Sequence, residues 1–153
     1  MKKLFLVLAA VFTLSMTANA HNALGVRFGG GQGYNAELSF QHGLGGNRLE
    51  LDLGLHSDDG YTDFSLTGIY QWMGTISGNF GWFAGVGAHL GYWNYDAVNN
   101  SDVALALAGQ AGLEYKFNAV PIQLTLDIRP RFYLIPSTDF HWGDIALGIR
   151  YCF

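Results

Sequence analysis

The sequence is poor in charge, cysteine and long apolar runs. Charged residues make up 13% of the 153 residues, about half the share usual in a soluble domain. The single cysteine, Cys152, excludes an internal disulfide. Beyond a short apolar segment at its start, the chain has no stretch of about 18 apolar residues, which excludes a membrane-spanning helix from the rest of the sequence.

The N-terminal segment has the features of a secretory signal peptide. The basic start Met1-Lys2-Lys3 precedes an apolar run from Leu4 to Leu14, and Ala18-Asn19-Ala20 forms a small-x-small cleavage site. The apolar run is too short to span a bilayer comfortably. We therefore expect residues 1–20 to be removed and residues 21–153 to form a single mature domain.

The mature domain is acidic and rich in glycine. Without the two N-terminal lysines it holds 6 Lys and Arg against 12 Asp and Glu, a net charge of −6. This balance leaves no basic patch, so nucleic acid is not an expected partner. The chain has 21 glycines and 15% aromatic residues, and its apolar residues alternate with polar ones instead of gathering in blocks. This combination favours a transmembrane β-barrel.

Alternation of apolar and other residues predicts eight strands, each near the 9–11 residues that cross a bilayer at a tilt. In the clearest segment, residues 49–56, every second residue is leucine. The predicted strands are 23–30, 34–42, 48–56, 63–72, 80–93, 103–117, 122–134 and 143–153. The predicted fold class is all-β, an eight-stranded antiparallel up-and-down transmembrane β-barrel.

The connections and the aromatic residues indicate how such a barrel lies in a membrane. With both ends of the mature chain in the periplasm, periplasmic turns fall at 44–47, 73–79 and 118–121, and outer loops fall at 30–33, 57–62, 94–102 and 136–142. Outward aromatic side chains form two belts at the predicted strand ends, as expected at membrane interfaces. Pro130 cannot donate a ladder hydrogen bond, so we expect a β-bulge there, near the outer rim.

The inward positions of the predicted strands hold nearly all the strand charge. The basic candidates are Arg27, Arg48, Lys116, Arg129, Arg131 and Arg150. The acidic candidates are Glu37, Glu50, Asp52, Glu114, Asp127 and Asp144. Burying an isolated ion is very costly, so these charges must pair; we expect Asp127 to pair with Arg129. Eight strands leave an interior just wide enough for side chains, which favours a lumen filled by a charge network over the alternative, a selective pore.

The end of the sequence carries a more specific pattern. Ile149, Tyr151 and Phe153 share one side of an alternating strand, which suits contact with lipid. Gly148, Tyr151 and Phe153 stand where the C-terminal assembly signal of outer-membrane barrels has its glycine and its two hydrophobic or aromatic positions. The segment Asp127-Ile128-Arg129-Pro130-Arg131 also looks like a late strand of porin-family proteins. From about residue 23 to 153, the chain resembles the small eight-stranded outer-membrane barrels of the outer membrane protein A and outer membrane protein X type.

This resemblance implies a location in the cell outer membrane, with membrane lipids and the outer-membrane assembly machinery as partners. It implies no catalytic, metal-binding or cofactor-binding residue. We expect a non-enzymatic monomer that has a structural role or presents acidic and aromatic loops to a partner outside the cell, which the sequence does not identify.

Two other functions remain open. One is a narrow porin for small solutes. The other, with less support, is an outer-membrane lipid-modifying enzyme. Outer-membrane lipid A deacylases resemble the chain in size and architecture, and they carry a His and a Ser two positions apart on one strand. None of the five histidines here is followed by Ser two positions later, which argues against carrying this activity over.

Overall fold

The computed structural model describes residues 22–29, 36–58, 61–95, 100–143 and 145–153. The segment predicted as a signal peptide and parts of the predicted outer loops lie outside these residues. The strands are β1 (Asn22–Gly29), β2 (Ala36–Leu44), β3 (Asn47–Asp58), β4 (Tyr61–Ser77), β5 (Phe80–Tyr95), β6 (Asn100–Lys116), β7 (Ile122–Ile128), β8 (Arg131–Ile135), β9 (Asp139–His141) and β10 (Ile145–Cys152). In the described part of the chain, no helix is long and apolar enough to cross a membrane.

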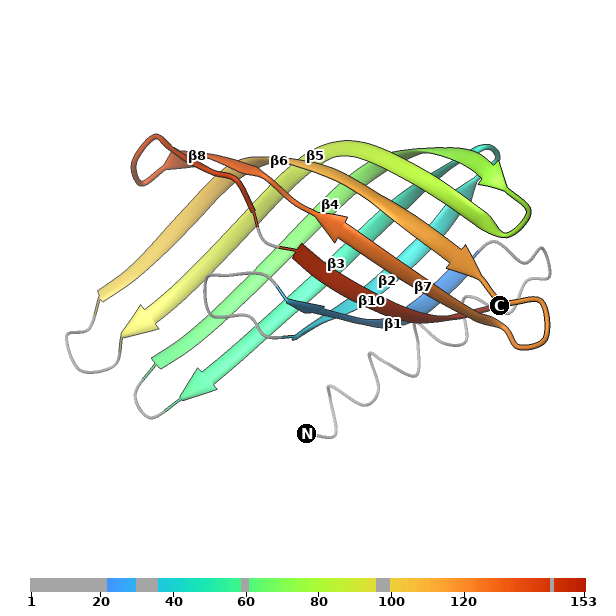
Figure 1. The fold of residues 1–153 in the computed structure, drawn as a ribbon. Helices are drawn as coiled ribbons and strands as arrows, with labels where there is room; N and C mark the ends of the chain where they lie inside the picture. The colour runs from blue at the N-terminus through green and yellow to red at the C-terminus, as the bar shows by residue number, and fades with distance from the viewer. Residues whose placement is uncertain (1–21, 30–35, 59–60, 96–99, 144) are drawn as a thin grey trace.

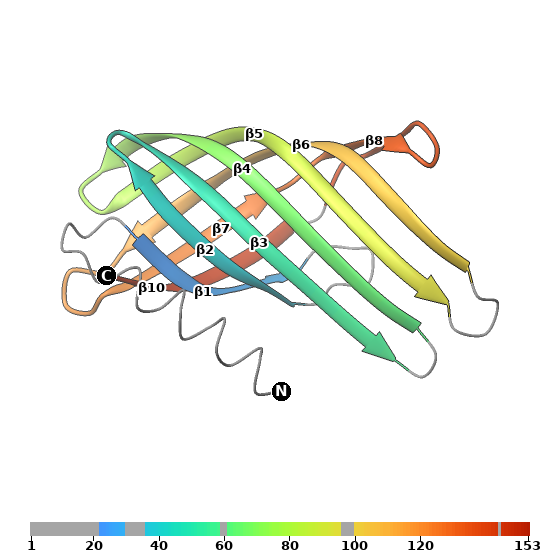
Figure 2. The ribbon, with the colours of Figure 1, turned by 180° about the vertical axis from the view of Figure 1, so that it is seen from behind.

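The strands form one antiparallel sheet that closes on itself (Figure 1). Neighbours follow the order β5-β4-β3-β2-β1-β10-β7-β6, and pairing between β5 and β6 completes the ring. β8 continues β7 along β6, and β9 pairs with β8 before the chain enters β10. The ten strands therefore make eight walls, and the predicted fold class is confirmed. Figure 2 shows β2, β3, β4 and β5 side by side with a common tilt, as barrel closure requires.

The side-chain alternation of each strand divides the barrel into two environments. In β3, Glu50 and Asp52 are fully buried in the interior, whereas Leu51 and Leu55 are exposed on the outer surface. The same alternation of buried and exposed residues runs through β7 and β10. The barrel is thus polar inside and apolar outside, which is the arrangement of barrels that face lipid.

Strand β4 is longer than the sequence suggested. It runs through Ser77, whereas the predicted strand ended at residue 72, so the turn predicted at 73–79 starts later than expected. The pairing with β5 shifts between Thr75 and Ser77, so the strand is bulged at this point and continues. The turn itself is Gly78 and Asn79. Gly78 has a φ of 54°, a left-handed conformation that glycine adopts without steric cost.

Pro130 lies in a gap between β7 and β8. Its carbonyl still accepts a hydrogen bond from the Gly109 N–H at 2.9 Å, and the register with β6 is the same before and after it. On its other side, the pairing of β7 with β10 ends at Ile128 and Ile145, and the pairing of β8 with β9 begins at Arg131 and His141. The register between β6 and β8 shifts farther along, between Leu105 and Ala106, and the β-bulge expected at Pro130 stays a prediction.

The two ends of the barrel differ. At one end, which we call the turn end, Gly45–Gly46, Gly78–Asn79 and residues 118–121 connect successive strands. The end of β10 lies beside the turn between β6 and β7 (Figure 1), and the Cys152 N–H donates to the Pro121 carbonyl at 2.8 Å. We call the opposite end the loop end. It contains the β8–β9 hairpin and the described parts of the predicted outer loops.

Aromatic side chains gather around the turn end. Three edge-to-face or stacked pairs lie on its outer surface: Tyr70–Trp72, Tyr115–Phe117 and Tyr151–Phe153. Each pair lies in a different strand or includes the residue that directly follows it, and the members are two positions apart, as residues on one face of an extended chain are. These pairs form the aromatic belt that the sequence predicts for this rim.

Candidate functional site: the barrel interior

The interior holds buried charge of both signs. Five arginines are buried there: Arg27, Arg48, Arg129, Arg131 and Arg150. Five carboxylates lie within ion-pairing distance of them: Glu37, Glu50, Asp52, Glu114 and Asp127. The two groups balance in formal charge, as low-dielectric surroundings require.

Glu50 is at the centre of this arrangement. Its carboxylate accepts hydrogen bonds from Arg129 at 2.9 Å and from Arg150 at 3.1 Å. The amides of Gln41 and Gln110 donate to the same carboxylate at 2.5 Å and 2.9 Å. Glu50 therefore joins side chains from five walls of the barrel, because its four partners come from β2, β6, β10 and the segment that follows β7.

Arg129 connects three acidic groups. Besides Glu50, its guanidinium pairs with Glu37 at 3.1 Å and with Asp52. A planar guanidinium can bind several carboxylates at once while staying charged. Arg27 extends the cluster, since it pairs with Glu37 at 3.0 Å and with Asp127 at 2.7 Å.

Arg150 reaches the centre because its neighbour has no side chain. A Cβ at Gly148 would overlap Thr125 Oγ1 and the guanidinium of Arg150. With glycine there, Arg150 receives support from Ser39 Oγ and Thr125 Oγ1, each at 2.8 Å. Gly148 thus makes the space that the Arg150–Glu50 ion pair occupies.

A second cluster lies nearer the turn end. Arg48 donates to Glu114 at 2.7 Å and to the Gln71 side-chain oxygen at 2.6 Å. Its guanidinium carbon also lies 5.2 Å from the centre of the Phe83 ring, within the range of a cation–π contact. Lys116 approaches the other oxygen of Glu114 at 3.3 Å.

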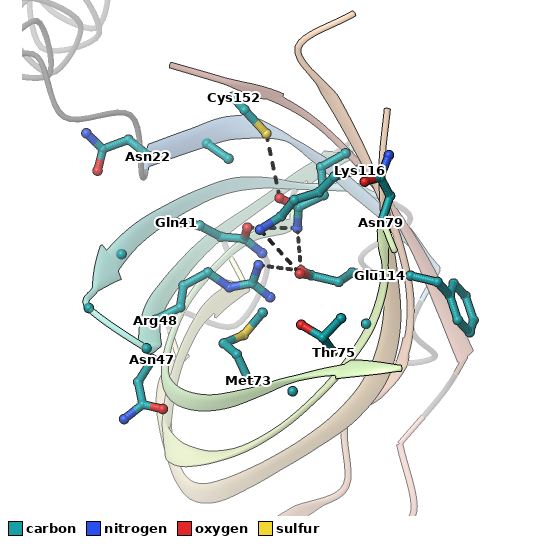
Figure 3. Close-up of a pocket in the computed structure, with 18 of the residues that line it drawn as sticks. Asn22, Gln41, Asn47, Arg48, Met73, Thr75, Asn79, Glu114, Lys116 and Cys152 are labelled. Atoms are coloured by element: carbon teal, nitrogen blue, oxygen red, sulfur yellow. Dashed lines mark hydrogen bonds and ion pairs between the residues drawn. The ribbon is translucent and has the colours of Figure 1, made fainter. Parts of the chain in front are cut away.

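A pocket of about 530 Å³ opens beside this second cluster, at the turn end. Figure 3 shows Arg48, Glu114 and Lys116 converging on it, with Met73 and Thr75 below and Cys152 above them. The Cys152 thiol lies 3.7 Å from the side-chain oxygen of Gln123.

Toward the loop end, the described part of the interior contains the buried side chains of Arg131 and His89. Arg131 lies 3.8 Å from Glu37. The buried His89 shares a 2.8 Å hydrogen bond with Thr67 Oγ1, and its ring contacts Tyr133 edge-on at 6.2 Å between ring centres. The surrounding wall of β6 is made of the small residues Ala104, Ala106 and Ala108.

The structure places the residues of the predicted charge network in two groups. Ten of the twelve charged candidates are buried in the interior: Arg27, Glu37, Arg48, Glu50, Asp52, Glu114, Asp127, Arg129, Arg131 and Arg150. Lys116 differs, because its side chain is 54% exposed at the turn end. Asp127 pairs with Arg27, so the expected partnership with Arg129 is wrong. The remaining acidic candidate, Asp144, lies outside the described residues.

Sequence reasoning missed the glutamines that link the ion pairs. Gln71 donates to Gln110 at 2.7 Å, Gln110 donates to Glu50 and Asp127, and Gln123 joins Gln41 to Glu114 at 3.1 Å each. An amide both donates and accepts, so it can connect two charged groups without adding charge. Their positions in the sequence could have identified them, because all of them are at inward-facing positions of the predicted strands.

The three residues of the predicted assembly signal lie on two faces of the last strand. Gly148 faces the interior, where a Cβ would meet Thr125 and Arg150, while Tyr151 is 55% exposed on the outer surface. Phe153 stacks on Tyr151 with 6.4 Å between ring centres.

The described residues contain no group of three or more His, Cys, Asp or Glu side chains arranged to hold a metal ion. The buried carboxylates face arginines and amides instead. Among these residues, the interior is therefore a site of ion pairing and hydrogen bonding.

No protein-family model matches the chain, and no curated protein matches its sequence. Solved structures do share its fold. The crystal structure of Neisserial surface protein A superposes with a TM-score of 0.59 at 12% identity, covering 88% of this chain and 94% of that one. The N-terminal β-barrel domain of Pseudomonas aeruginosa OprF gives a TM-score of 0.61 at 19% identity, covering 88% of this chain and 100% of that domain. The likeness establishes the fold, that of eight-stranded outer-membrane β-barrels.

Proposed function

We propose that the chain is a non-enzymatic integral protein of the bacterial outer membrane, with a lumen filled by side chains. In this proposal it stabilises the envelope or presents its acidic and aromatic loops to a partner outside the cell. The apolar outer surface, the aromatic pairs around the turn end and the fold likeness support the location.

The observation that carries the proposal is the ion pairing around Glu50. Arg150 and Arg129 reach Glu50 from walls that are not its neighbours in the sheet. Side chains that meet from distant walls occupy the space through which solutes would pass. A structural or loop-presenting role requires no such passage.

Orientation and assembly follow from the same proposal. The turn end faces the periplasm, and residues 1–20 direct export before they are removed. The exposed ring of Tyr151 and the stacked ring of Phe153 serve, with Gly148, as the signal that the outer-membrane assembly machinery recognises.

A fractionation experiment tests the location. The full chain is expressed in a Gram-negative host, and the membranes are separated by density. We expect the mature protein, beginning at His21, in the outer-membrane fraction and in a folded form that migrates differently on gels before and after heating. Recovery in the inner membrane or in the soluble periplasm would contradict the proposal.

A narrow porin is the second candidate, and the turn-end pocket favours it. The pocket of about 530 Å³ shows that part of the interior is open. Uptake of small sugars and amino acids by liposomes that contain the purified barrel separates the two functions. Swelling no faster than that of empty liposomes supports the filled lumen, and rapid swelling supports the porin.

The interior offers little to a lipid-modifying enzyme. Thr67 and His89 form a hydroxyl–imidazole pair, but both are buried inside the barrel. Membrane lipids contact the outer surface, so this pair does not reach them. We therefore propose no enzymatic role.

A further inference from the structure

The turn-end pocket has a property that a structural or loop-presenting role does not use. Its lining combines two cationic side chains, Arg48 and Lys116, with the single carboxylate of Glu114. Side-chain amides complete it, among them Asn22 of β1 and Asn79 of the turn between β4 and β5. The described lining therefore carries one net positive charge together with many neutral hydrogen-bonding groups.

The only acidic group among the described residues of this lining is already well bonded. Glu114 accepts from Arg48 at 2.7 Å and from Gln123 at 3.1 Å, and the Lys116 ammonium lies 3.3 Å away. Each partner is a donor, so the carboxylate has little left to offer a ligand. Its negative charge is offset locally, which leaves the second cation of the pocket uncompensated.

Arg48 also has donor capacity to spare. Its Nε bonds to Gln71 and its Nη1 bonds to Glu114. Its Nη2 has no hydrogen-bond partner among the residues that the structure describes, although it is buried. Leaving a buried donor unpaired is costly, particularly on a charged group. An acceptor that entered the pocket and reached this nitrogen would remove the cost.

We propose that the turn-end pocket binds a small polar molecule that carries one oxyanion group, a carboxylate or a phosphate. Arg48 and Lys116 hold the oxyanion, and the surrounding amides hold the polar body. A volume of about 530 Å³ lies within the range of small-molecule sites. The inference goes beyond the proposed function, because binding at this mouth requires no passage through the barrel.

Cys152 provides a reporter inside the pocket. It lines the pocket and is the only cysteine of the chain, so thiol labelling reads this site alone. The experiment compares two small methanethiosulfonates, one bearing a sulfonate and one bearing a trimethylammonium group, on the folded barrel in neutral detergent. The rate at which the sulfonate reagent labels Cys152 is divided by the rate for the trimethylammonium reagent. This ratio is then divided by the corresponding ratio for the reaction of the two reagents with 2-mercaptoethanol. We expect this normalised ratio to be about three- to tenfold above one, as a nearby uncompensated cation attracts the anionic reagent.

Three variants test the origin of the effect. Lys116→Gln should bring the ratio close to one, and it should fold because Glu114 keeps Arg48 and Gln123. Lys116→Arg should retain the ratio. Ser137→Asp, which makes the same change in net charge at the exposed β8–β9 turn of the loop end, should leave the ratio unchanged. A ratio that falls equally in Lys116→Gln and Ser137→Asp would mean a general charge effect and would overturn the proposal.

Protection of Cys152 identifies the source of the oxyanion. Acetate and inorganic phosphate, added at constant ionic strength against chloride, should slow the labelling of the wild type and not of Lys116→Gln. Protection by free ions in neutral detergent indicates a soluble ligand. Protection only in vesicles that contain phosphatidylglycerol, compared with phosphatidylcholine alone, indicates a lipid headgroup.

The phosphorus NMR linewidth of inorganic phosphate measures binding without depending on the thiol. The wild-type barrel should broaden the resonance, and Lys116→Gln should not. A normalised ratio near one, together with no protection and no broadening by the wild type, would overturn the proposal. This combined result would mean that the pocket holds only solvent.

Discussion

Arg150 of β10 and Glu50 of β3 form an ion pair of 3.1 Å inside the barrel, although 100 positions separate them in the sequence. Two strands lie between β3 and β10 in the sheet, so the pair reaches across the interior. Both side chains are fully buried. Each charge therefore depends on the other, because removing one partner of a buried pair leaves an uncompensated ion.

Replacing Glu50 with Gln should destabilise the barrel strongly. The substitution keeps the side-chain shape but removes the charge that Arg129 and Arg150 share. We expect the free energy of unfolding to fall by about 3–5 kcal/mol, measured by urea titration of the refolded protein in lipid or detergent.

Leu51→Ala is the matched control for this prediction. Leu51 is the next residue along β3, and it faces outward. Lipid or detergent can fill much of the space that its side chain leaves, so the loss should be clearly smaller than for Glu50→Gln. Equal losses for the two variants would contradict the assignment of the two faces.

Asp127→Asn should have an intermediate effect. Its carboxylate pairs with Arg27, which keeps Glu37 as a second acidic partner. We expect a loss of about 1.5–3 kcal/mol, the range for a hydrogen bond to a charged group, in the same urea titration. A larger loss than for Glu50→Gln would show that Glu50 is not the centre of the cluster.

Two glycines at the interface between β4 and β5 should respond in opposite ways to alanine. A Cβ at Gly87 would overlap the carbonyl oxygen of Gly68, whereas a Cβ at Gly68 would meet Leu51 at an ordinary 3.4 Å. Gly87→Ala should therefore lower the stability by about 1–3 kcal/mol or prevent folding, and Gly68→Ala should be nearly neutral. The yield of folded protein and the urea midpoint measure both; similar behaviour of the two variants would contradict the close pairing of these strands at Gly87.

If Phe153 belongs to an assembly signal, the loss of a phenylalanine ring should impair assembly at residue 153 and not at the loop end of the barrel. Phe153→Ala should reduce the amount of folded protein in the outer membrane and increase a protease-sensitive periplasmic form, because it removes the ring that stacks on Tyr151. Phe140→Ala removes an exposed ring of the same size from β9 at the loop end and should leave the yield unchanged. Equal yields for the two variants would remove the support for a special role of Phe153.

The sequence predicted the fold and the two faces because both depend on local alternation. In a strand, successive side chains point to opposite faces, so the leucines around Glu50 and Asp52 were enough to assign β3. The same alternation was also enough to assign the inward and outward faces of β7 and β10. It failed in β4, where a bulge near Ile76 carries the strand past its predicted end at residue 72.

Partners across the interior could not be predicted in the same way. Which side chains meet depends on the stagger of the strands and on the tilt of the barrel, which the period of one strand does not contain. Asp127 therefore meets Arg27 of β1 rather than its near neighbour in the sequence, Arg129. Lys116 was placed on the correct face, but only the position of the strand end shows that it lies at the mouth of a pocket.

Single-channel conductance of the purified wild-type barrel in a planar bilayer tests the central claim most directly. If the ion pairs around Glu50 fill the lumen, no steady conductance of a single size should appear across the voltages that the bilayer withstands. Asp127→Asn should then change the stability of the barrel without creating ion selectivity. A reproducible open channel in the wild type, with an Asp127→Asn variant that is equally stable but altered in ion selectivity, would contradict the filled lumen and make the protein a narrow porin.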